Sequence, residues 1–141
     1  MTLSGTNVYQ YQPGLFNANS YLSSGIPYLT GSALSTADFA ASNSQVKVSF
    51  PYVTRAVTVI NTSGSIIRAH FNAITGANVI AGRHYTSISG ANASVTYNVK
   101  CREIYISLAN STYNSDFEVI AELTTINSQE MFQLTGSGLS V

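Results

Sequence analysis

Three consecutive segments within residues 45–71 alternate apolar and polar side chains with a period of two. This period places the apolar side chains on one face of a pleated sheet and the polar ones on the other. The polar stretch 61–65 lies between the second and third segments and contains Gly64, so it is expected to form a hairpin loop. The apolar positions are Val46, Val48 and Phe50 in the first segment, Val57 and Val59 in the second, and Ile67, Ala69 and Phe71 in the third.

Further segments of the same kind follow in the second half of the chain. The expected strands there are Arg83–Ser89, Ser94–Lys100, Arg102–Ala109 and Phe117–Leu123, with weaker candidates at Ile26–Thr30, Asn78–Ile80 and 126–141.

About eight short strands without a convincing helix predict an all-β fold, a single eight-stranded antiparallel jelly-roll sandwich of two four-stranded sheets. An immunoglobulin-like sandwich is the competing topology, but the chain has no Trp and one Cys, so the signals of that fold are absent. The residues expected in the core are Val48, Phe50, Val57, Val59, Phe71, Val95, Tyr97, Ile104, Ile106, Val119 and Leu123.

The first 37 residues carry no charged side chain. Pro13-Gly14 and the Gly25–Pro27 stretch interrupt regular structure there. We therefore predict an uncharged, extended N-terminal arm over residues 1–37 and a jelly-roll domain over residues 38–141, with one helical turn at Thr36–Ala41. Two interpretations of the arm stay open: a flexible segment, or one ordered against a neighbouring subunit, because spaced tyrosines supply contact area and a hydroxyl group.

Composition limits the partners that the chain is expected to bind. Charged residues make up 9%, against roughly 25% in an average soluble domain, and six basic residues balance six acidic ones. We expect no nucleic-acid binding, because no excess of positive charge is present to neutralise phosphates, while a neutral surface favours association between copies. The N-terminal residues lack the pattern of a signal peptide, and no apolar run reaches 18 residues, so no membrane insertion is expected.

Few residues suggest chemistry. Alternation places His70 on the polar face with Arg68, looking outward, and neither histidine belongs to a metal-binding spacing. Cys101 lies between two cations, which would favour a thiolate nucleophile, but a buried or edge cysteine between two sheet segments is the preferred interpretation. A small enzyme would need a pocket in which His84 or Cys101 meets a carboxylate. We therefore predict no catalytic residues, no metal, no cofactor and no enzymatic activity.

Several segments, in their order along the chain, resemble the single jelly-roll minor capsid proteins of nucleocytoplasmic large DNA viruses, those of algal viruses above all. The resemblance covers residues 45–139 and is carried by Val48–Asn61 with Ile67–Phe71, Tyr97–Ser107, Phe117–Thr124 and Leu134–Leu139.

What the resemblance implies is a penton protein, a homopentamer that closes the five-fold vertices of an icosahedral shell tiled by double jelly-roll major capsid proteins. Its implied partners are its own copies, the major capsid protein and other minor capsid proteins. Its implied location is the capsid vertex of the virion, after assembly in the host cytoplasm.

Two functions are carried forward from the sequence. The first is a structural capsid protein that acts through subunit packing without chemistry. The alternative is a carbohydrate-binding or receptor-binding jelly-roll module of a virion fibre or spike, because exposed tyrosines stack on sugar rings. The residues expected at contacts, chosen by residue type, are Tyr9, Tyr11, Phe16, Tyr21, Arg55, Arg68, His70, Arg83 and Arg102.

Overall fold

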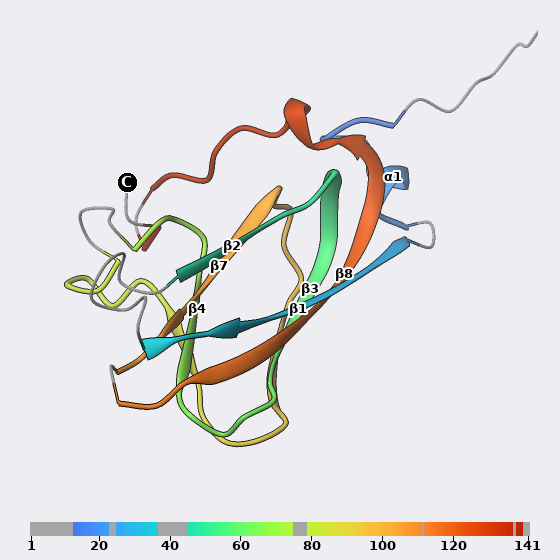
Figure 1. The fold of residues 1–141 in the computed structure, drawn as a ribbon. Helices are drawn as coiled ribbons and strands as arrows, with labels where there is room; N and C mark the ends of the chain where they lie inside the picture. Colours follow the sequence, from blue (N-terminus) through green and yellow to red (C-terminus); the bar gives the residue numbers. More distant parts are fainter. Residues whose placement is uncertain are drawn as a thin grey trace, which may run out of the picture.

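The computed structural model describes residues 13–22, 25–36, 45–74, 79–110, 112–136 and 138–139. In this part of the chain, eight strands form two four-stranded antiparallel sheets that pack face to face (Figure 1). The β8 sheet has the order β1-β8-β3-β6 and the β7 sheet the order β2-β7-β4-β5. The elements are α1 (Asn19–Leu22), β1 (Ile26–Leu34), β2 (Gln45–Ser49), β3 (Tyr52–Asn61), β4 (Ile67–His70), β5 (Thr86–Ile88), β6 (Ala93–Tyr97), β7 (Glu103–Leu108), β8 (Ser115–Asn127) and a 3-10 helix at Ser128–Glu130.

The pairing of the strands is nested. β1 pairs with β8, β2 with β7, β3 with β6 and β4 with β5, so the first four strands meet the last four in reverse order. Additional β3–β8 and β4–β7 ladders complete the two sheets. This is the arrangement of one long hairpin rolled up into a sandwich, and the predicted jelly-roll-like fold is confirmed.

β8 shows how the sequence forms the core. From Ser115 to Leu123 its buried side chains alternate with exposed ones, so one row points between the sheets and the other points outward. The predicted core is confirmed: Val48, Phe50, Val57, Val59, Ile104, Ile106, Val119 and Leu123 are buried in one cluster, and Phe71, Val95 and Tyr97 pack against it.

β1 corrects the predicted boundary of the arm. The weak strand expected at Ile26–Thr30 is a nine-residue strand, Ile26–Leu34, which pairs along its whole length with β8. The arm therefore does not extend over residues 1–37, because this part of it belongs to the sandwich. The alternation is hard to detect here because most β1 side chains are exposed, and Pro27 is tolerated because β1 is an edge strand.

Other expected elements are shorter or lie elsewhere. The strand expected at Arg83–Ser89 is only β5, Thr86–Ile88, and residues 79–83 form turns instead of a strand. Of the helical turn expected at Thr36–Ala41, residues 37–41 lie outside the described residues.

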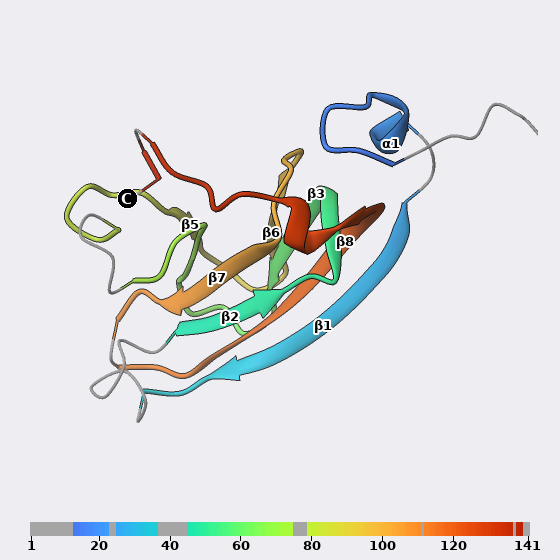
Figure 2. The ribbon, with the colours of Figure 1, turned by 90° about the horizontal axis from the view of Figure 1, so that it is seen from above.

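Residues 13–22 pack on the body of their own chain (Figure 2). The Arg55 Nη1 atom donates to the Tyr21 carbonyl at 3.1 Å, and the Lys100 ammonium donates to the Leu15 carbonyl at 3.3 Å. Tyr21 also packs against a second small cluster that contains Val53. These contacts hold residues 13–22 against their own chain.

His70 corrects a second expectation. It lies on the outer face of the β7 sheet, as the alternation indicates, but it is only 1% exposed. The chain after β4 folds back over this face: Asn72 is buried, and the Ile74 amide donates to the Gln45 side chain on β2 at 2.7 Å. The prediction that His70 looks into solvent was wrong, because periodicity indicates a face of the sheet and not what covers that face.

Candidate interaction surface

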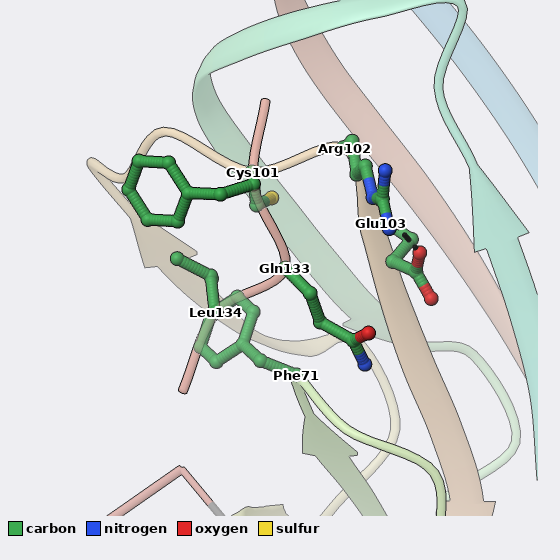
Figure 3. Close-up of a pocket in the computed structure, with 7 residues that line it drawn as sticks. Phe71, Cys101, Arg102, Glu103, Gln133 and Leu134 are labelled. Carbon is green, nitrogen blue, oxygen red and sulfur yellow. Dashed lines mark ion pairs between the residues drawn. The ribbon is translucent and has the colours of Figure 1, made fainter. Parts of the chain in front are cut away.

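Cys101 is buried two residues before the start of β7. Its thiol lies 3.3 Å from the Thr54 hydroxyl, and burial raises its pKa to about 11 despite that hydrogen bond. The space beside it measures about 10 Å³, roughly the volume needed for one water molecule. Figure 3 shows the Leu134 and Phe71 side chains next to one another in this space, with Arg102 and Glu103 side by side. The preferred interpretation of Cys101 as a buried thiol is confirmed.

His70 is held as a neutral imidazole. Its Nδ1 atom lies 2.7 Å from the Asn72 carbonyl, which only accepts, so Nδ1 carries the proton and Nε2 accepts from the Ser107 hydroxyl at 2.9 Å. The ring stacks on Tyr105 with centroids 5.9 Å apart. Burial and then the positive charge of Arg68 lower the His70 pKa, against the opposing effect of the Asn72 carbonyl. These contacts give His70 a structural role in the β7 sheet.

The lowered pKa predicts acid sensitivity. The unfolded chain binds a proton on His70 near pH 6.5 while the folded chain does not, so the free energy of unfolding should fall as the pH drops from 7 to 5. One such group contributes a slope of at most about 1.4 kcal/mol per pH unit. Urea denaturation at pH 7, 6 and 5 measures this slope. His70→Gln should flatten this slope, because a glutamine side chain does not titrate; a slope equal to that of the wild-type chain would contradict the assignment.

The described ranges hold neither a cluster of candidate metal ligands nor a helix that could span a membrane. No three His, Cys, Asp or Glu side chains there are grouped as metal ligands. No helix in the same part of the chain has the length and apolar character needed to cross a membrane.

The predicted contact residues do not gather on one surface. Phe16 is 88% exposed, Arg55 pairs with Glu122 at 2.7 Å, and the Arg68 guanidinium lies 4.4 Å from the Tyr85 ring centroid. Arg102 lies 3.4 Å from the Glu103 carboxylate and donates to the Met131 carbonyl. Arg83 is exposed in a turn, Tyr21 and His70 are used within the chain, and Tyr9 and Tyr11 lie outside the described residues.

The outer face of the β8 sheet contains two apolar residues that sequence reasoning missed. Leu29 and Ile120 are 72% and 41% exposed, and they face one another in the β1–β8 register. Two residues further along β1, Gly31 lies opposite Glu118 and has no side chain to fill the surface. The result is a shallow hollow of about 330 Å³ lined by Leu29, Thr30, Gly31, Glu118, Val119 and Ile120. An isoleucine between two glutamates in the exposed row of β8 is the sequence signal that would have indicated it.

An exposed turn precedes β5. Residues 80–83 are exposed, and Ile80 is 42% exposed. Two backbone hydrogen bonds close the turn, from the Arg83 amide to the Ile80 carbonyl at 3.1 Å and from the His84 amide to the Val79 carbonyl at 2.9 Å. Val79 is fully buried and anchors the turn to the body.

The two surfaces differ in charge although the chain is neutral in total. Asp116, Glu118 and Glu122 all project from the outer face of β8, where Arg55 pairs with Glu122. The exposed turn carries Arg83, and Arg68 lies beside Tyr85 just after it. The charges are thus separated into an acidic face and a basic turn.

The chain matches no protein-family model and no curated protein sequence. Its candidate site is therefore defined by the geometry above: an acidic, partly apolar sheet face and a basic turn, both suited to contacts with another macromolecule. The buried Cys101 contacts Thr54 in the interior, whereas His70 lies beside the turn and lines a recess of about 300 Å³ with Arg83 and His84.

Proposed function

We propose that the protein is a structural capsid protein that forms the pentameric vertex of an icosahedral large DNA virus. The observation that carries the proposal is the eight-stranded jelly-roll sandwich whose β8 sheet leaves an apolar, acidic outer face uncovered. The resemblance in residues 45–139 supplies the viral class. The function is subunit packing, without a chemical step.

A five-fold ring needs two different surfaces on each subunit, because each copy contacts one neighbour with one patch and the next neighbour with another. The face around Leu29 and Ile120 is one such surface, and the turn at Ile80–Arg83 is a second. The major capsid protein and other minor capsid proteins are the proposed partners around the ring, and the virion vertex is its proposed location.

Native mass spectrometry and negative-stain microscopy of the purified chain test this function. The expected result is a species of five times 15.0 kDa and closed five-membered rings. A defined complex of another stoichiometry, or a monomer that stays single when mixed with major capsid protein, would overturn the pentameric vertex.

A recess at one end of the sandwich favours a second candidate, a carbohydrate-binding module of a fibre or spike. Tyr113 is 64% exposed there and lines a recess of about 540 Å³ with Ser63, Ser65 and Asn110. An aromatic face beside hydroxyl and amide groups suits a sugar ring, which presents C–H groups on its face and hydroxyls at its edge.

A glycan array separates the two candidates. Selective binding by the wild-type chain that is lost in Tyr113→Ala, with no ring formation, would favour the carbohydrate-binding module. Tyr52→Ala is the matched control, since Tyr52 is also exposed, at 37%, but does not line this recess. An array without selective binding argues for the capsid function.

A further inference from the structure

We infer that the turn Val79–His84 of one copy docks into the hollow between β1 and β8 on a second copy of this chain. The inference rests on the proposed function in one respect, that copies of the chain associate, and it specifies the surfaces that meet. Ile80 enters the hollow, and Arg83 pairs with Glu118 of the neighbour.

The turn Val79–His84 is already ordered before it binds. The turn is closed by its two backbone hydrogen bonds and anchored by buried Val79, so Ile80 and Arg83 are presented together. Arg83 has φ of 58°, in the left-handed region that non-glycine residues rarely adopt. Such strained conformations persist where the surroundings impose them, and they concentrate at functional sites. A preformed turn loses little conformational freedom on docking.

The receiving partner is a hollow with an apolar wall and a charged rim. Leu29 and Ile120 supply the exposed apolar surface, and Glu118 supplies a carboxylate. Gly31 leaves the hollow open, and a Cβ atom at this position would lie 3.1 Å from the Phe117 carbonyl oxygen of β8. Its volume of about 330 Å³ is enough for one aliphatic side chain and its neighbours.

The charges on the turn and on the rim of the hollow favour a second copy of this chain as the occupant of the hollow. Among the described residues, neither Arg83 nor Glu118 takes part in an ion pair, whereas Glu103 and Glu122 do. Asp116 adds negative charge on the same face as Glu118, and Arg68 adds positive charge close to the turn through its contact with Tyr85. Opposite charges on the two surfaces steer their encounter and fix their register.

The placement of the two surfaces permits a continuous assembly. Figure 2 shows the yellow-green turn before β5 on one side of the sandwich and β1 along another. A copy that inserts its turn into a neighbour therefore still offers its own hollow to a third copy. Such a heterologous contact closes into a ring when the rotation between neighbours divides a full circle.

A charge swap tests the docking by sedimentation velocity in 50 mM and 300 mM NaCl. Glu118→Arg and Arg83→Glu should each weaken the association constant by roughly tenfold or more at 50 mM NaCl, because attraction becomes repulsion. The protein that carries both changes should recover association, since the pair is restored with its charges exchanged. Wild-type association should weaken at 300 mM NaCl.

Two variants control for folding and for total charge. Arg83→Asn removes the charge with a residue that tolerates the left-handed region, and it should also weaken association. Glu130→Lys changes the net charge as Glu118→Arg does, but on the 3-10 helix, and should leave association unchanged. Circular dichroism establishes that each variant is folded.

The outcomes separate the inference from the proposed function. Suppose that the chain forms five-membered rings and that neither salt nor either single charge reversal weakens them. This result would overturn the docking but would leave the capsid function standing. If the double exchange rescues association but the closed assembly contains a number of copies other than five, the docking is supported and the pentamer is overturned. A wild-type chain that does not self-associate at 50 mM NaCl would overturn the docking.

Discussion

Replacing Phe117 by alanine is expected to lower the free energy of unfolding by about 3–5 kcal/mol. Phe117 is 1% exposed and is one of the largest fully buried side chains. It lies on β8 between β1 and β3, opposite Ser32 and Asn61, so neighbouring strands on both sides limit how far the site can collapse. Since small domains are stable by about 5–15 kcal/mol, this one change removes a large part of the total.

Urea denaturation followed by circular dichroism measures the loss for Phe117→Ala. Ile120→Ala is the matched control, because Ile120 lies on the same strand with 41% exposure on the opposite face. It should cost less than about 1 kcal/mol at a protein concentration where the chain is monomeric. Equal costs at Phe117 and Ile120 would show that β8 does not alternate between core and surface as described.

Replacing Asn61 by alanine is expected to cost about 2–3 kcal/mol, because its amide satisfies several backbone groups at once. The side chain is fully buried, and its Nδ2 atom donates to the Ile88 carbonyl at 2.9 Å and to the Ser65 carbonyl. Its Oδ1 atom accepts from the Ser63 and Gly64 amides at 3.1 and 3.2 Å. Asn61 ends β3 in one sheet and Ile88 ends β5 in the other, so this residue links the two sheets at the ends of these strands.

Thermal and urea unfolding of Asn61→Ala test this role. Thr58→Val is the control on the same strand, since its hydroxyl only pairs with that of Thr96 at 2.9 Å on the exposed face. The control should change stability by about 0.5 kcal/mol or less. A stability of Asn61→Ala close to that of the control would mean that water replaces the amide, and that the link between the sheets contributes little.

The sequence indicated the core because alternation is a local property of a strand. The alternating β8 residues Val119 and Leu123 face the core as expected, and so do Val57 and Val59 on β3. The same local pattern was too weak in β1, where Tyr28 packs on the core but most side chains are exposed. β1 is recognised only through its ladder with β8, and such pairings join residues far apart in the chain.

The candidate surfaces were harder to predict from the sequence than the fold was. Residue type selected Arg83 as a contact residue, and the structure places it in an exposed, left-handed turn. Leu29 and Ile120 were missed because each is a single apolar residue among polar neighbours in the chain, and only the β1–β8 register places them opposite one another. The hollow beside them depends on Gly31, whose missing side chain matters only next to that pair.

The sequence by itself determined an all-β chain with a neutral surface, the faces of its central strands and the residues of its core, because these follow from composition and a period of two. Only the tertiary structure decided what covers each face. The chain after β4 buries His70 on the β7 sheet, while Leu29 and Ile120 on the β8 sheet stay exposed. Burial depends on contacts between segments distant in sequence, and periodicity carries no information about those contacts.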